Sequence, residues 1–211
     1  MADLPYPRLA LIADGFTDDA RAGRAVTAVE AGVRWVHLRD HDAAPEAFRG
    51  AAESLVSRLR DAAEAVTVTV NGRADVADEL GLGLHVGWRG PAVPEARDVL
   101  GSETLIGYSA HELVEAEGDR TQGTDYYFFS PVFPTSSKPD QPPTGIGPLR
   151  AFCQAAAPTP VLALGGLTPN RVAACREAGA RGVAVLSGIM EVDTPGAAAR
   201  AYLRALNEVR K

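Results

Sequence analysis

The residue best placed for acid–base chemistry is His111, which follows the apolar run Thr104–Tyr108 and begins a stretch of helical composition, His111–Glu117. An imidazole at the start of a helix lies near the positive end of the helix dipole, which favours the neutral ring. Neutral imidazole accepts a proton near pH 7. His111 is therefore the candidate catalytic residue, and a helix-capping or exposed histidine is the alternative.

Two other histidines lie inside apolar runs. His85 falls within Leu82–Val86, and this position favours a hydrogen-bonded core histidine, either structural or in contact with residues that bind the ligand. His37 falls within Val33–Leu38, where alternation directs it either into the core or into the mouth of a site. We count His37 among the candidate substrate-binding residues and leave its role open.

Glycines at the ends of two apolar runs are typical of a phosphate site. Gly165 and Gly166 follow Val161–Leu164, and Ser187-Gly188-Ile189 follows Gly182–Leu186. Paired glycines let the backbone approach a ligand closely, and a short helix beginning at Ser187 would direct free N–H groups at an anion. The alternative is that these glycines only form tight turns.

Two cations complete the candidate binding residues. Arg39 ends a predicted strand and suits a carboxylate, which its guanidinium can hold bidentately. Lys138 lies in the long segment Ser130–Gly147, and only two of the 21 basic residues are lysines. A solvated surface position is the alternative for either residue, although a rare lysine is harder to dismiss.

The elements that must position these residues alternate regularly along the chain. The predicted strands are Leu9–Ala13, Val33–Leu38, Val66–Val70, Leu82–Val86, Thr104–Tyr108, Asp125–Phe129, Val161–Leu164 and Gly182–Leu186. The predicted helices are Ala20–Ala31, Pro45–Ala63, Ala74–Leu80, His111–Glu117, Pro148–Ala156, Thr168–Ala178 and Pro195–Val209. This alternation predicts an α/β fold, a single (β/α)8 TIM barrel over residues 1–211, whose strand ends carry the site. An open doubly wound sheet is the alternative, but no GxGxxG turn follows the first strand.

Composition narrows the class of partner. The chain is 46% hydrophobic and carries a net charge of -6, which suits one globular domain and argues against nucleic acid as a partner. Cys153 and Cys175 have no metal-ligand spacing and are expected to be reduced thiols. No signal peptide or membrane span is apparent, so we expect a cytoplasmic protein that binds a small molecule and no membrane.

Seven of the predicted strand–loop junctions, in order, resemble those of the thiamine phosphate synthase/TenI family. The matching segments are His37-Leu38-Arg39, Asn71-Gly72-Arg73, His85-Val86-Gly87, Gly107-Tyr108-Ser109, Pro134-Thr135-Ser136-Ser137-Lys138, Ala163-Leu164-Gly165-Gly166 and Val185-Leu186-Ser187-Gly188-Ile189. The resemblance runs along nearly the whole chain and implies a TIM barrel that binds a phosphorylated thiazole, in a homo-oligomer. It adds Asn71, Ser109, Thr135 and Leu186 to the substrate-binding residues.

The departures from the synthase pattern affect one half of its site. In the synthases that this chain resembles, aspartates occupy the positions of Gly72 and Gly90, and those aspartates hold the Mg²⁺ that binds a pyrimidine diphosphate. Glycine side chains offer Mg²⁺ no oxygen ligand. His37 and His41 replace the glutamine and lysine that grip the diphosphate. We therefore expect no metal and no cofactor. The part of the site that would bind the diphosphate has lost its binding residues, and the part that would bind thiazole phosphate has kept them.

The remaining pattern resembles the TenI-type thiazole tautomerases, which have His-x-Arg, Asn-Gly-Arg and a histidine just after the strand-five serine. That resemblance implies an isomerase of thiamin biosynthesis, which aromatises a carboxythiazole phosphate by a 1,3-proton shift with His111 as base and acid. Two alternatives stay open. One is a working thiamine phosphate synthase with replaced metal ligands, and the other is a non-catalytic module that binds thiazole phosphate.

Overall fold

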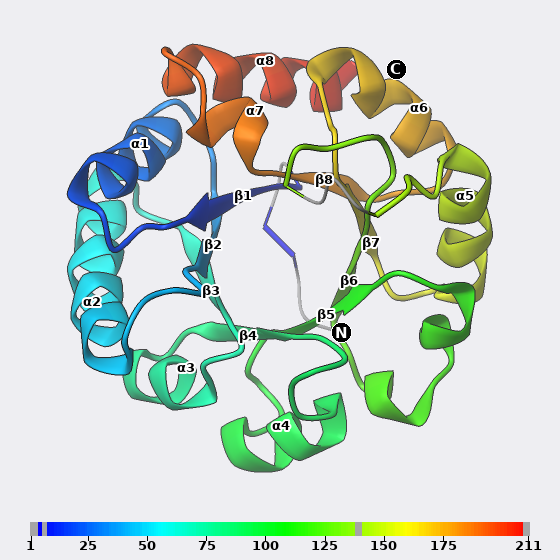
Figure 1. Ribbon diagram of the computed structural model, residues 1–211, viewed down its shortest axis with the longest axis horizontal. Coiled ribbons are helices and arrows are strands. Elements are labelled where there is room, and N and C mark those ends of the chain that lie inside the picture. The colour runs from blue at the N-terminus through cyan, green and yellow to red at the C-terminus, as the bar shows by residue number, and fades with distance from the viewer. Residues whose placement is uncertain (1–3, 6–7, 138–140, 209–211) are drawn as a thin grey trace.

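The protein is a closed barrel of eight parallel strands (Figure 1). The computed structural model describes residues 4–5, 8–137 and 141–208. Each strand pairs with the next along the chain, and β1 closes the ring against β8. The strands are β1 (Leu9–Asp14), β2 (Trp35–Arg39), β3 (Thr67–Asn71), β4 (Gly83–Val86), β5 (Ile106–Ala110), β6 (Tyr126–Phe129), β7 (Val161–Leu164) and β8 (Gly182–Val185). The predicted (β/α)8 TIM barrel is confirmed.

Helices surround the barrel and cover its outer face (Figure 1). The α-helices are α1 (Asp19–Glu30), α2 (Pro45–Ala62), α3 (Ala74–Leu80), α4 (Val93–Leu100), α5 (Ile146–Ala155), α6 (Val172–Glu177), α7 (Ser187–Met190) and α8 (Pro195–Glu208). Three short 3-10 helices are η1 (Leu113–Ala116), η2 (Asp119–Thr121) and η3 (Pro169–Arg171). Within the described residues, no helix is long and apolar enough to cross a membrane.

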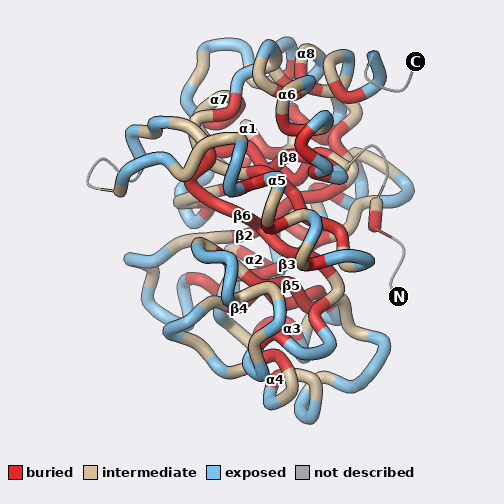
Figure 2. Tube along the Cα trace, turned by 90° about the vertical axis from the view of Figure 1, so that its right-hand side faces the viewer, coloured by how far each residue is buried: buried red, intermediate tan, exposed pale blue. Residues whose placement is uncertain are grey.

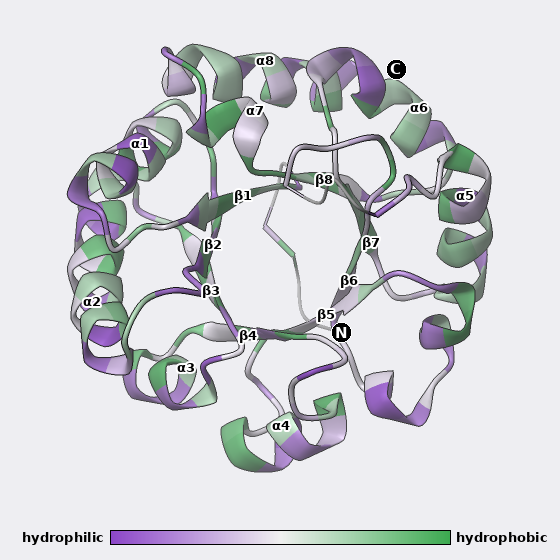
Figure 3. Ribbon diagram, viewed as in Figure 1, coloured by the Kyte–Doolittle hydropathy of each residue, from purple (hydrophilic) through white to green (hydrophobic). Residues whose placement is uncertain are grey.

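Sequence periodicity explains how each layer is buried. The strands are buried on both faces, as expected where helices cover a parallel sheet (Figure 2). Helix α2 buries Phe48, Ala52, Leu55, Val56 and Leu59, a spacing of three to four residues that keeps one stripe against the strands. The helices accordingly show apolar and polar faces side by side (Figure 3).

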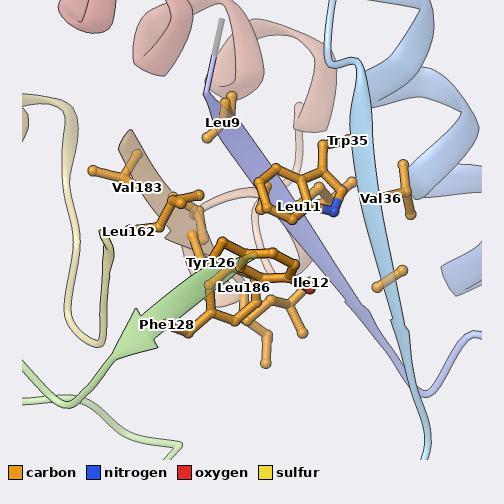
Figure 4. Close-up of a cluster of buried hydrophobic side chains, with 14 of the residues drawn as sticks. Leu9, Leu11, Ile12, Trp35, Val36, Tyr126, Phe128, Leu162, Val183 and Leu186 are labelled. Atoms are coloured by element: carbon orange, nitrogen blue, oxygen red, sulfur yellow. The ribbon is translucent and has the colours of Figure 1, made fainter. Parts of the chain in front are cut away.

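Large aromatic side chains fill one side of the barrel interior. Trp35 packs edge-on against Tyr126 with ring centroids 4.6 Å apart, and Phe128 lies 5.2 Å from Tyr126 (Figure 4). Gly107 makes room for this cluster, because a Cβ there would lie 2.0 Å from the Tyr126 ring. The interior is therefore packed below the mouth, and any ligand must bind at the strand ends.

The structure differs from the sequence expectation in three helical regions. Helix α4 was not predicted. The predicted helix His111–Glu117 is instead the short 3-10 helix η1, and Gly118, two residues after its last residue, is the N-cap of η2. The predicted helix Thr168–Ala178 is divided into η3 and α6; Thr168 is the N-cap of η3, but its side chain makes no cap hydrogen bond.

Candidate active site

A pocket opens at the carboxyl ends of β1, β2 and β6 to β8, where the sequence predicts a ligand. It has about 510 Å³ of empty space, part of it open to solvent. The residues that line it are Ile12, Arg39, Ser130, Pro131, Thr135, Ser137, Leu164, Gly165, Gly166, Leu167, Ala184, Val185, Leu186, Ser187 and Gly188. Seven of the predicted substrate-binding residues are therefore brought together: Arg39, Thr135, Gly165, Gly166, Leu186, Ser187 and Gly188. The prediction for Lys138 lies outside the described residues.

Gly165 and Gly166 form the turn after β7 against the loop that follows β6. Both have positive φ, +95° and +61°, which favours glycine. A Cβ on Gly166 would lie 2.3 Å from the carbonyl oxygen of Pro134, so no larger residue fits. Phe133 also donates a backbone hydrogen bond to the Gly165 carbonyl at 3.1 Å. The tight-turn interpretation is thus correct for this pair, and it is compatible with phosphate binding because the same turn lines the pocket.

The predicted extra helix after β8 is present as α7, four residues long. Ile189 and Met190 both donate backbone hydrogen bonds to the Leu186 carbonyl. The first N–H groups of a helix have no partner within it, so the amides of Ser187 and Gly188, two residues that line the pocket, are available to a ligand. A Cβ on Gly188 would lie 2.1 Å from the Tyr202 hydroxyl, which donates to the Leu167 carbonyl at 2.7 Å.

Arg39 lies at the rim of the pocket and is tethered there by Asp14. Its Nε donates to Asp14 Oδ1 at 2.7 Å, and both side chains are about a quarter to a third exposed (25% and 30%). This bond joins the ends of the paired strands β1 and β2 and fixes where the guanidinium lies. Asp14 was not singled out from the sequence, although it ends a strand of the barrel like the other site residues.

His111 follows β5 and lies at the edge of the same mouth, outside the residues that line the pocket. Its Nδ1 lies 2.6 Å from the carbonyl oxygen of Ser130, a pocket residue. A carbonyl can only accept, so Nδ1 carries the proton and Nε2 of the neutral ring has the lone pair. Glu115 accepts hydrogen bonds from the backbone N–H groups of His111 and Glu112. The turn is therefore held by a carboxylate, in place of the predicted α-helix.

His37 and His85 lie below the mouth in the barrel interior, 2% and 1% exposed. His37 Nδ1 lies 3.0 Å from Thr69 Oγ1, and His85 Nε2 lies 2.8 Å from Ser109 Oγ. Burial lowers the pKa of His85 to about 3, and burial together with the nearby His85 and Arg39 holds the pKa of His37 well below its usual range. The expectation of a hydrogen-bonded core histidine is confirmed for His85.

Two further predicted binding residues lie at or next to the last residue of a strand, close to the buried histidines. Asn71 ends β3 and hydrogen-bonds to His37, which raises the pKa of that imidazole slightly against the effect of burial. Ser109 lies on β5 and is partly exposed above His85. Neither lines the pocket, and nor does His37. The structure thus divides the predicted residues between a pocket over β6 to β8 and a polar rim over β2 to β5.

Residues 9–189 match the model of one protein family, TMP-TENI, described as thiamine monophosphate synthase. The chain belongs to this family. Among its curated relatives, a thiamine-phosphate synthase of Chloroflexus aurantiacus is 37% identical over 206 residues, covering 96% of this chain and 93% of that protein. A thiamine-phosphate synthase of Synechococcus sp. (strain WH7803) is 36% identical over 203 residues. That alignment covers 94% of this chain but 57% of the relative.

Solved structures of other proteins share this fold. The thiamine phosphate pyrophosphorylase from Pyrococcus furiosus superposes with a TM-score of 0.84 at 24% identity, over 96% of both chains. A second structure, described as native KDPGal, superposes with a TM-score of 0.71 at 17% identity over 100% of this chain. At these identities the likeness establishes the barrel and carries no argument about substrate.

The residues of this TMP-TENI family member do not fit a magnesium ion at the expected positions. Gly72 and Gly90 stand there, and a Cβ would meet nothing within 4 Å at Gly72 and nothing nearer than 3.6 Å at Gly90. Space is available, but ligand oxygens are not. Across residues 4–5, 8–137 and 141–208, no group of three or more His, Cys, Asp or Glu side chains is arranged to hold a metal.

Proposed function

We propose that this protein is a thiazole tautomerase, an isomerase that aromatises a carboxythiazole phosphate. The observation that carries the proposal is the hydrogen bond from His111 Nδ1 to the Ser130 carbonyl, at the edge of a pocket with spare backbone donors. This bond engages Nδ1 and leaves Nε2 of His111 to act as the base at the edge of the pocket. A single base that gives a proton back after taking one is what a proton shift between two carbons requires.

In the proposed reaction, Nε2 of His111 takes the proton from ring C2, and the electron pair shifts through the ring. The resulting imidazolium returns a proton to the exocyclic carbon, so the product is an isomer of the substrate and no electron is gained or lost. The amides of Ser187 and Gly188 and the Gly165-Gly166 turn would bind the phosphate. Arg39, tethered by Asp14, would bind the ring carboxylate.

A second candidate is thiamine-phosphate synthase, because the curated relatives described above carry that name. It would join a pyrimidine diphosphate to thiazole phosphate. Gly72 and Gly90 count against it, because they remove the carboxylates that would bind a metal–diphosphate complex. The family assignment is common to both candidates, so the choice depends on chemistry at these positions.

One pair of assays separates the two. The purified protein is incubated with the non-aromatic carboxythiazole phosphate in deuterated water, and deuterium entering at the exocyclic carbon is followed. In parallel it is incubated with the pyrimidine diphosphate, thiazole phosphate and Mg²⁺. We expect tautomer formation in the first assay and no thiamine phosphate in the second. Robust coupling without tautomer formation would replace the proposal by the synthase, and tight thiazole phosphate binding without either reaction would indicate a non-catalytic binder.

A further inference from the structure

A chain of hydrogen bonds crosses the barrel interior and ends at Ser109 on the rim. Trp35 Nε1 donates to Thr69 Oγ1 at 3.1 Å, and Thr69 also hydrogen-bonds to Tyr126. His85 Nδ1 lies 3.1 Å from Tyr126 Oη, and its Nε2 lies 2.8 Å from Ser109 Oγ. The first four side chains are at most 1% exposed, and Ser109 alone reaches the mouth. The proposed proton shift does not use His85 or Tyr126.

The protonation states along this chain are set by burial. Burial lowers the pKa of His85 to about 3, so its ring is neutral near pH 7. Burial also raises the pKa of Tyr126, so its phenol keeps its proton. A neutral imidazole has one donor and one acceptor nitrogen. Two arrangements are therefore open: Ser109 either receives a proton from His85 Nε2 or gives one to it.

The chemistry of the two hydroxyl groups decides between these arrangements. A phenol is a much stronger acid than an aliphatic alcohol, so the imidazole lone pair takes the Tyr126 hydrogen in preference to that of Ser109. The aliphatic oxygen of Ser109 is in turn the better acceptor for the imidazole N–H. Both ends favour the same direction, and hydrogen bonds that run in one direction strengthen one another.

We propose that Tyr126 and His85 are positioning residues that hold Ser109 as a hydrogen-bond donor toward the ligand. The bonds run from the Tyr126 hydroxyl to His85 Nδ1 and from His85 Nε2 to Ser109 Oγ. The Ser109 oxygen is then engaged as an acceptor, and its own hydrogen is free to face the mouth. Such a serine selects a ligand atom that carries a lone pair and no proton, such as a carboxylate oxygen or an aromatic ring nitrogen. The identity of that ligand rests on the proposed function, but the direction of the bonds does not.

The direction is measured in the ligand-free protein by ¹⁵N–¹H NMR of ring-labelled histidine. The chain has four histidines, and the His85 ring is identified by the signals that are lost in His85→Gln. We expect the neutral tautomer with hydrogen on Nε2, unchanged between pH 8 and pH 5. The tautomer with hydrogen on Nδ1 would overturn the proposal. Because this measurement needs no turnover, it tests the direction of the hydrogen bonds separately from the proposed function. The expected His85 tautomer in a protein without tautomerase activity would support the hydrogen-bond direction and refute the proposed function.

The effect on the ligand is measured by calorimetric binding of the aromatic carboxythiazole phosphate. Tyr126→Phe removes the donor to His85, and we expect affinity to fall about 3- to 10-fold, the usual effect of one lost hydrogen bond. Tyr127→Phe is the matched control, because the neighbouring hydroxyl bonds outside this chain of side chains, to the Ala116 carbonyl at 3.4 Å and to Thr121, and its effect should stay within about twofold.

A double-mutant cycle separates positioning from general destabilisation. Once Ser109→Ala has removed the donor to the ligand, Tyr126→Phe should weaken binding no further, because Tyr126 and His85 act on the ligand only through Ser109. If Tyr126→Phe weakens binding equally with and without Ser109, the tyrosine acts through packing alone and the proposal fails.

Discussion

Replacing Gly188 by alanine tests whether the start of α7 is part of the binding pocket. Gly188 does not have positive φ, so the backbone accepts alanine, and the obstacle is the added methyl group, 2.1 Å from the Tyr202 hydroxyl. Contact would require a separation above roughly 3.3 Å, so α7 or Tyr202 must move by about 1 Å. Overpacking of this kind costs about 1–3 kcal/mol, and losing the Tyr202 bond to the Leu167 carbonyl adds about 1 kcal/mol.

We therefore expect Gly188→Ala to lower the free energy of unfolding by about 2–4 kcal/mol, which lowers Tm by roughly 4–16 °C in a chain of this size. Binding of thiazole phosphate should weaken at least tenfold, because the amides at the start of α7 are displaced. The matched control is Gly50→Ala in α2, where a Cβ meets nothing within 4 Å and helix propensity should raise stability by about 0.5–1 kcal/mol. Wild-type stability and ligand affinity in Gly188→Ala would refute the geometry given for α7.

Two further perturbations follow from the buried imidazole and from the rim. The pKa of His85 is near 6.5 in the unfolded chain and about 3 in the folded protein, so at acidic pH the unfolded chain binds this proton more readily. The free energy of unfolding is therefore unaffected by this histidine above pH 6.5 and decreases progressively as pH falls below that value. At pH 5 the loss is about 2 kcal/mol, and a free energy of unfolding from urea titrations that is the same at pH 7 and pH 5 would contradict this. Arg39→Ala should weaken binding of the carboxythiazole phosphate by about tenfold more than binding of the same thiazole phosphate without its carboxylate. Equal losses for the two ligands would show that Arg39 does not bind the carboxylate.

Much of the barrel is predictable because its strands are short apolar runs closed by polar residues or glycine. The structure keeps Val161–Leu164 as predicted, and the ends of the other strands differ from the predicted bounds by at most two residues. Helix α4 was missed because it has eight residues and buries only Val93 and Ala96, which leaves little periodicity to detect. The helix expected over His111–Glu117 forms only the 3-10 turn η1, whose start the Glu115 carboxylate caps, and Gly118 is already the N-cap of η2.

The contacts that orient the site residues are harder to predict from the sequence, because they join segments far apart in the chain. The Ser130 carbonyl that fixes the His111 ring is 19 residues away, and Asp14 lies 25 residues before Arg39. Residue types at strand ends indicated which side chains reach the mouth, but not which of them pair. The division between the pocket and the polar rim of Asn71 and Ser109 likewise depends on how the barrel closes.

The most direct test of the proposed function is turnover of the carboxythiazole phosphate by His111→Ala. If His111 moves the proton, kcat should fall about 10²- to 10⁴-fold, the usual effect of removing a general base. Affinity for the aromatic product should change by less than about threefold, because the proposed phosphate and carboxylate contacts are left in place. Wild-type turnover in this variant would contradict the account and assign the proton shift to another group.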